Sequence, residues 1–236
     1  MDIDNLLQRK ILGGQEYEPL FPRVSCDKTK LGNGNTFDTV RMIKDMVVKY
    51  NHQTIKVAEL LQQSSLKETC DKIYWFLYNH LQYKADGQEQ MLRSPACAFR
   101  QRVEGVDCKT YSIFASCLLT NMGVRHYIRQ IKQPSFKPEL YTHVYVIVPL
   151  NQETGDIKNG YFIIDGTTST NREPIYIMAH DTEVNLPHYG LNAPIKGKRK
   201  TVTTKVATNI AKDSNKTVYL GIAGFFAGLF LLGKAK

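Results

Sequence analysis

The chain has 236 residues, which is enough for one well-buried domain and a tail. Its formal net charge of +9 is unevenly spread: nine Lys or Arg residues and one acid follow residue 195, so the first 195 residues carry only +1. Because a nearly neutral body lacks the basic surface typical of nucleic-acid-binding domains, sequence-specific binding of nucleic acid is not expected.

The cysteines point to a reducing compartment. Their number, five, is odd, and the first residues show no secretory signal, so we expect free thiols and a cytoplasmic protein. The sequence contains no C-x-x-C and no H-x-x-x-H pair, so neither a zinc site nor any other cofactor is expected. Three of the cysteines should be small core residues: Cys70, Cys97 and Cys117.

The first part of the chain should be an arm followed by helices. Residues 1–35 carry prolines and a Gly/Asn cluster and are expected to form an irregular arm before a domain over 36–195. A first helix should begin at Thr36, which is placed to cap it. Shorter helical patterns follow over 55–63 and 66–83. The apolar stripe of the first helix is Phe37, Val40, Ile43, Val47 and Tyr50.

The second part of the domain should be a helix followed by strands. The best helix begins at Cys108 and ends at Gly123, and one of its faces carries small residues that would allow close approach to a sheet. Strand patterns follow over 124–131, 142–148 and 161–164. Helices followed by an antiparallel meander predict an α+β fold, with a helical N-terminal part packed on an antiparallel β-sheet. His180 is expected in a solvated loop.

Cys108 stands where its thiol can become reactive. It lies in the first turn of its helix, where unpaired backbone N–H groups and the positive end of the helix dipole favour a thiolate. Asp107 can cap this helix, but its negative charge works against thiolate formation. A nearby base is therefore still needed.

His143 and Asp165 can supply that base and its partner. A turn near Thr154-Gly155 would fold the strands that hold them into a hairpin and place His143 opposite Asp165. Directly opposite residues have Cβ atoms roughly 4.5–5.5 Å apart, which is close enough for a carboxylate–imidazole hydrogen bond. Alternation along the strands puts both side chains on the same face.

These segments resemble the transglutaminase-like superfamily of papain-like cysteine hydrolases and acyltransferases. The similarity lies in GVDC before a helix, a strand opening THVYV and a strand closing FIIDGT, with LRSPACAFRQRVEGVDC as the lead-in. It covers about residues 36–173 and is greatest to small proteins of bacteriophages and mobile elements. The resemblance implies that Cys108 is the nucleophile, His143 the base and Asp165 the acid that orients the base.

The implied function is acyl transfer on peptide or protein amides through a thioester acyl-enzyme. Hydrolysis ranks before transfer to an amine because it needs no second substrate site. The Cys108 backbone N–H is a natural oxyanion donor, and Gln101 is a further candidate. Lys109-Thr110 departs from the acidic residues often found after the cysteine in such proteins, which leaves the substrate open. The alternative is a catalytically silent structural or accessory protein of a phage particle or mobile element.

The tail has two parts. Residues 196–217 are basic and polar and should form a solvated linker. Residues 218–236 are apolar and Gly-rich, and their 16 uncharged residues would form a helix about 24 Å long, short for a hydrocarbon core of about 30 Å. This segment could contact a membrane or be buried within a particle. Membrane or virion association is therefore an alternative to a purely cytoplasmic location. Salt-dependent binding of nucleic acid by the basic tail is a third hypothesis.

Overall fold

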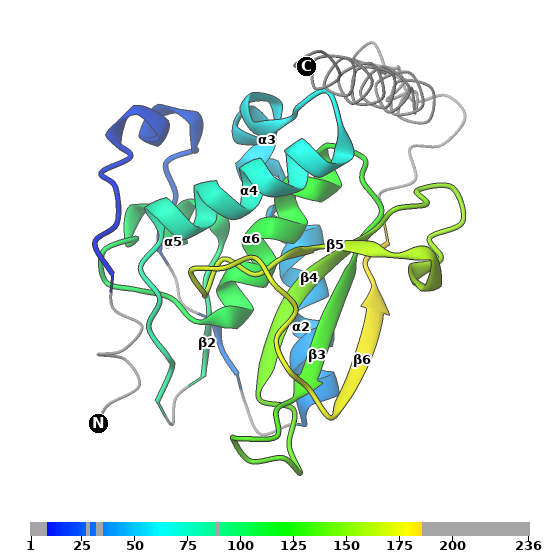
Figure 1. Cartoon of the computed structure of the whole chain (residues 1–236). Helices are drawn as coiled ribbons and strands as arrows, with labels where there is room; N and C mark the ends of the chain where they lie inside the picture. Colours follow the sequence, from blue (N-terminus) through cyan, green and yellow to red (C-terminus); the bar gives the residue numbers. More distant parts are fainter. Residues whose placement is uncertain (1–8, 27–28, 32–34, 88–89, 186–236) are drawn as a thin grey trace, which may run out of the picture. The chain divides into compact units, whose positions relative to one another are not determined.

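A computed structural model describes residues 9–26, 29–31, 35–87 and 90–185 (Figure 1). The predicted linker and C-terminal helix, 196–217 and 218–236, lie outside these ranges, so the expectations for them stay predictions. None of the helices in the described ranges has the length and apolar character needed to cross a membrane.

The expected α+β architecture is confirmed: helices precede and cover an antiparallel sheet (Figure 1). The α-helices are α2 (Thr36–Tyr50), α3 (Ile55–Leu61), α4 (Leu66–His80), α5 (Pro95–Arg100) and α6 (Cys108–Asn121). The 3₁₀ helices are η1 (Gln15–Leu20), η2 (Asn51–Thr54) and η3 (Ile157–Asn159). The strands are β1 (Thr29–Lys30), β2 (Met91–Leu92), β3 (Tyr127–Lys132), β4 (His143–Pro149), β5 (Tyr161–Ile164) and β6 (Met178–Glu183).

Helix α6 lies at the centre of the domain that the described residues form (Figure 1). Every side chain from Lys109 to Thr120 is buried, and the helix shares one apolar cluster with α4, β4 and β5 and a second with α2, β3 and β4. Its face of small residues allows a close approach to the sheet. The Ser112 hydroxyl donates to the Val144 carbonyl of β4 at 3.3 Å. Gly123 ends the helix at a φ of 67°, in the left-handed region that favours glycine.

The start of α2 differs from the prediction. Asn35, not Thr36, caps the helix: its side chain accepts from the backbone N–H groups of Phe37 and Asp38, and the Asp38 carboxylate accepts from the Asn35 N–H. This reciprocal arrangement satisfies N–H groups that Thr36 could not reach from inside the helix. Phe37 is 50% exposed instead of core, whereas Val40, Ile43 and Val47 are buried as predicted.

The N-terminal arm is less irregular than expected and is attached to the domain. It contains η1, its strand β1 pairs with β2, and a disulfide joins Cys26 to Cys97 on α5. The expectation that all cysteines are free is therefore wrong for this pair. The two cysteines are 71 residues apart, and only the path of the arm along α5 brings them together. Cys70 and Cys117 are buried free thiols, as predicted.

The sheet has the strand order β5-β4-β3-β6, and every neighbouring pair is antiparallel. In the β4–β5 hairpin, Ile147 lies opposite Ile163, a register two residues away from the predicted one. A shift of two residues keeps every side chain on its predicted face. The loop predicted at His180 is wrong, because this residue lies on β6 opposite Gln130 of β3, but its side chain is exposed as predicted.

Candidate active site

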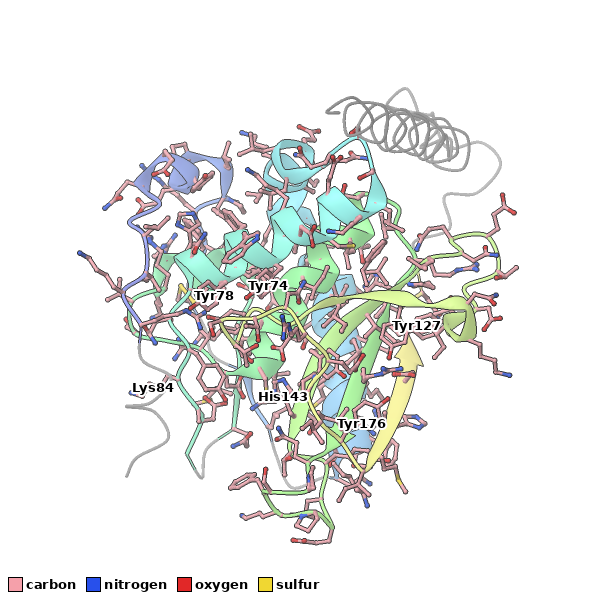
Figure 2. The ribbon with its side chains drawn as sticks, viewed as in Figure 1. Tyr74, Tyr78, Lys84, Tyr127, His143 and Tyr176 are labelled. Atoms are coloured by element: carbon pink, nitrogen blue, oxygen red, sulfur yellow. A yellow bond between two sulfur atoms is a disulfide. The ribbon has the colours of Figure 1, made fainter. Side chains whose placement is uncertain are left out.

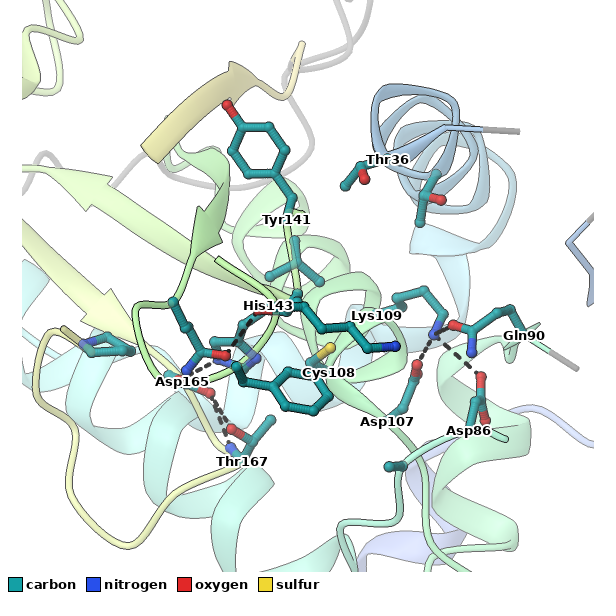
Figure 3. Close-up of a pocket in the computed structure, with 18 of the residues that line it drawn as sticks. Thr36, Asp86, Gln90, Asp107, Cys108, Lys109, Tyr141, His143, Asp165 and Thr167 are labelled. Atoms are coloured by element: carbon teal, nitrogen blue, oxygen red, sulfur yellow. Dashed lines mark hydrogen bonds and ion pairs between the residues drawn. The ribbon is translucent and has the colours of Figure 1, made fainter. Parts of the chain in front are cut away.

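The structure brings Cys108, His143 and Asp165 together in one cleft (Figure 3). Cys108 is the first residue of α6, and the Asp107 side chain caps this helix by accepting from the Thr110 N–H at 3.3 Å. Backbone N–H groups in a first helical turn have no acceptor within the helix, so those around Cys108 are available to an anion. Cys108 is partly exposed, and the other two free cysteines are buried.

His143 and Asp165 form a close pair at the adjacent ends of two strands. His143 begins β4, Asp165 follows the last residue of β5, and His143 Nε2 lies 2.7 Å from Asp165 Oδ2. The side chain of Asp165 is only 1% exposed, so this contact is shielded from water. Because Nε2 is engaged with the carboxylate, the other ring nitrogen, Nδ1, is left for the thiol of Cys108.

The charges of the pair follow from these contacts. Burial disfavours the protonated form of His143, but Asp165 and a hydrogen bond with Cys108 outweigh it, so the pKa of His143 is raised well above 6.5. Burial likewise disfavours the carboxylate of Asp165, yet His143 and Thr167 lower its pKa below 3.8. The surroundings therefore favour a proton on the His143 ring, between Asp165 and Cys108, so the ring is placed to hold a proton taken from the cysteine.

Thr167 holds the carboxylate in place. Its backbone N–H and its hydroxyl both donate to Asp165 Oδ1, at 3.2 and 2.7 Å. The two oxygens of Asp165 thus have separate partners, Thr167 on Oδ1 and His143 on Oδ2. The sequence carried a signal for the backbone contact, because an Asp side chain in a turn often accepts from the backbone N–H two residues further along.

A polar network on the outer face of the sheet supports His143. The ring of Tyr145 lies 5.6 Å from that of His143, and the Tyr145 hydroxyl donates to Glu173. Glu173 also accepts from Arg129 at 3.1 Å, and Arg129 makes two hydrogen bonds to Asp181 on β6, at 2.7 and 2.8 Å. Sequence patterns did not predict this network, because its members come from three strands and a loop.

Lys109 corrects the expectation that the charge of Asp107 opposes a thiolate. The Lys109 side chain is 8% exposed, and its ammonium contacts Asp107 and lies 3.2 Å from Asp86 Oδ2 and 2.6 Å from Gln90 Oε1 (Figure 3). Burial lowers the pKa of Lys109, although Asp86 acts in the opposite direction. The negative charge next to Cys108 is therefore compensated by the residue that follows it.

The cleft that contains these residues has a volume of about 1240 Å³ and opens to the surface. Its walls combine the N-terminal end of α2, the β3–β4 loop and the loop after β5. Gln101 does not line it and instead follows the last residue of α5. The lining includes Thr36, Val40, Tyr83, Gln90, Phe136, Lys137, Tyr141 and Pro174.

Within the described ranges, no three His, Cys, Asp or Glu side chains are grouped as metal ligands would be. His126 is fully buried, with Nδ1 2.8 Å from the Val124 carbonyl, and burial lowers its pKa to about 4. It is therefore a neutral histidine of the core, away from the cleft lining.

Comparisons of the chain with family models, with curated proteins and with solved structures found no match.

Proposed function

We propose that this protein is a cysteine-dependent amide hydrolase or acyl transferase of the transglutaminase-like kind, with Cys108 as nucleophile, His143 as base and Asp165 as the residue that orients His143. The observation that carries the proposal is the meeting of these three side chains, from three separate elements, in an open cleft. A family resemblance predicted all three from the sequence, and the 2.7 Å contact between His143 and Asp165 supports that prediction.

The chemistry follows the roles of the three groups. His143 takes the thiol proton, and the sulfur of Cys108 attacks an amide carbonyl to form a C–S bond. Backbone N–H groups at the start of α6 stabilise the oxyanion, and His143 donates its proton to the leaving nitrogen as the C–N bond breaks. Water then attacks the thioester with His143 as base, which releases the acid and restores the thiol.

The substrate is proposed to be a peptide or protein segment. A cleft of about 1240 Å³ exceeds the usual range for small-molecule pockets, roughly 300–1,000 Å³, and its open form suits an extended chain. Hydrolysis is preferred over transfer to an amine because water needs no binding site of its own. If an amine were the acceptor, adding a primary amine to the reaction would divert the acyl product.

The proposal is tested by the pH profile of iodoacetamide alkylation at Cys108, read by mass spectrometry in wild type, His143→Ala and His180→Ala. The histidine on β6 is the matched control, because His180 is exposed and does not line the cleft. Wild type and His180→Ala should react fast at a pH well below the free-thiol range of about 8.5. His143→Ala should lose this reactivity.

The same measurement separates the proposed enzyme from a silent accessory protein. Burial raises the pKa of Cys70 to about 12 and also raises that of Cys117, so alkylation near neutral pH reports on Cys108. A profile that is the same with and without His143 would show that no activated Cys–His pair exists and would exclude the catalytic mechanism. A second readout is the acetyl-thioester formed on Cys108 by p-nitrophenyl acetate, which should be absent in Cys108→Ser.

A further inference from the structure

Arg9, in the N-terminal arm, binds the loop that follows Asp165. Its Nη1 donates to the Thr167 carbonyl at 3.0 Å, and its Nη2 donates to the Gly166 carbonyl at 2.8 Å. These two peptide groups come directly after Asp165, and Thr167 is also the residue whose N–H and hydroxyl hold Asp165 Oδ1. Arg9 therefore contacts the backbone that sets the position of the carboxylate.

The other contacts of Arg9 fix the guanidinium on the helices behind the loop. Its Nε donates to the Tyr78 carbonyl at 3.0 Å, and Nη2 also donates to the Leu81 carbonyl at 3.1 Å and the Tyr111 hydroxyl at 2.9 Å. The guanidinium carbon lies 3.9 Å from the centre of the Tyr78 ring. Tyr78 belongs to α4 and is labelled in Figure 2. Only the planar fork of an arginine can join this many acceptors at once, so a lysine would not replace it.

The loop has little freedom to adjust without Arg9. A Cβ added to Gly166 would lie 3.0 Å from Leu77 Cβ and 3.0 Å from Tyr111 Cδ1, so the loop runs in tight contact with α4 and α6. Its two carbonyls point to a charged donor that is itself held by both of these helices. A buried carbonyl that loses its donor is destabilised unless it moves to find another. Loss of Arg9 should therefore displace the segment that carries Asp165.

We propose that Arg9 is a positioning residue for the active site, and that the N-terminal arm contributes to the site by supplying this residue. This inference rests on the proposed function. None of the side-chain hydrogen bonds of Arg9 within the described part of the chain reaches Cys108 or His143; Arg9 acts through residues 166–167 on Asp165, and through Asp165 on the imidazole. The sequence resemblance gave no sign of this, because it begins at about residue 36 and leaves out the arm.

A matched control separates positioning from simple attachment of the arm. Arg102 also binds the arm, with Nε 2.6 Å from the Gly13 carbonyl and Nη2 2.8 Å from Glu18, but none of its contacts reaches residues 166–167. Arg9→Met and Arg102→Met should therefore both loosen the arm and lower thermal stability. Only Arg9→Met should change the chemistry of the imidazole.

The experiment is an NMR titration of His143 in wild type, Arg9→Met and Arg102→Met, together with the rate of Cys108 alkylation near neutral pH. Arg9→Met should lower the pKa of His143 by about one unit and slow alkylation about tenfold, because the carboxylate partner is no longer held in place. Arg102→Met should leave both values as in wild type. Should Arg9→Met not fold, Arg9→Lys carries the same test, since it keeps the charge and loses the fork.

Three results would overturn the inference. An unchanged His143 pKa in Arg9→Met would show that Asp165 needs no support from the arm. A raised pKa would show that Arg9 acts only as a nearby positive charge, which on removal favours the imidazolium. An equal fall in Arg102→Met would show that general loosening is the cause. If wild-type alkylation were itself independent of His143, the proposed function would fail, and this is visible without either arginine variant.

Discussion

The most informative single substitution is Asp165→Asn, because the two carboxylate oxygens have different partners. Oδ1 accepts from Thr167, and an asparagine oxygen in that place keeps both hydrogen bonds. The amide NH₂ then replaces Oδ2, 2.7 Å from His143 Nε2. Since an NH₂ group only donates, Nε2 must accept, and the ring proton moves to Nδ1, the nitrogen needed for the thiol. The shape of the site is preserved, but the ring proton of His143 lies on the nitrogen that should accept the thiol proton.

The size of the effect follows from the lost charge-assisted hydrogen bond. Such bonds contribute about 1.5–3 kcal/mol, and Asp165 is 1% exposed, so water does not substitute for it. One pKa unit corresponds to 1.36 kcal/mol, so the pKa of His143 should fall by roughly one to two units. The alkylation rate of Cys108 near neutral pH should fall roughly 10- to 150-fold for the same reason.

The assay is second-order alkylation by iodoacetamide under native conditions, with circular dichroism and urea unfolding as checks of the fold. Asp165→Asn should keep the circular dichroism spectrum of wild type and unfold cooperatively in urea, because its contacts with Thr167 remain. If alkylation slowed only in proportion to a loss of stability, or did not slow at all, the orienting role of Asp165 would be wrong. His143→Ala provides the lower limit of the rate.

Three further predictions concern the surroundings of the site and the stability of the fold. Lys109→Met should slow the alkylation of Cys108 under native conditions about tenfold, because the charge of Asp107 is no longer compensated. Adding Asp107→Asn to the same chain should restore the wild-type rate. Buried His126 has a pKa of about 4, against 6.5 in the unfolded chain, so its contribution to the free energy of unfolding is complete above pH 6.5 and falls by about 3 kcal/mol as the pH falls toward 4. His126→Leu should reduce this pH dependence in a series of urea unfoldings, and an unchanged slope would contradict the assignment. Reduction of the disulfide between Cys26 and Cys97, which are 71 residues apart, should lower the free energy of unfolding by about 2–4 kcal/mol. In a variant with both cysteines changed to Ser, reductant should leave the free energy of unfolding unchanged, and an equal decrease in the two proteins would exclude the bridge as the cause.

Local patterns in the sequence were sufficient to find the elements that carry the site. Strand β5 has the predicted bounds, and β3, β4, α3 and α4 differ from prediction by a few residues at their ends. Hydrophobic periodicity works here because each element buries one face or is wholly internal. The alternation of side chains placed His143 and Asp165 on one face, and that placement survived a register error of two residues because the period of a strand is two.

Other features depend on residues that are distant in sequence and could be seen only once the chain was folded. The Cys26–Cys97 disulfide, the pairing of β6 with β3, and the contact of Arg9 with the loop after Asp165 each join segments far apart in the chain. No short-range propensity encodes such contacts, since each is fixed by how whole elements pack. The sequence by itself determined which residues can perform the chemistry and on which elements they lie. The tertiary structure decided which charges compensate one another, how the carboxylate is held, and that the N-terminal arm reaches the loop behind Asp165, because hydrogen bonds and ion pairs depend on distances that only packing sets.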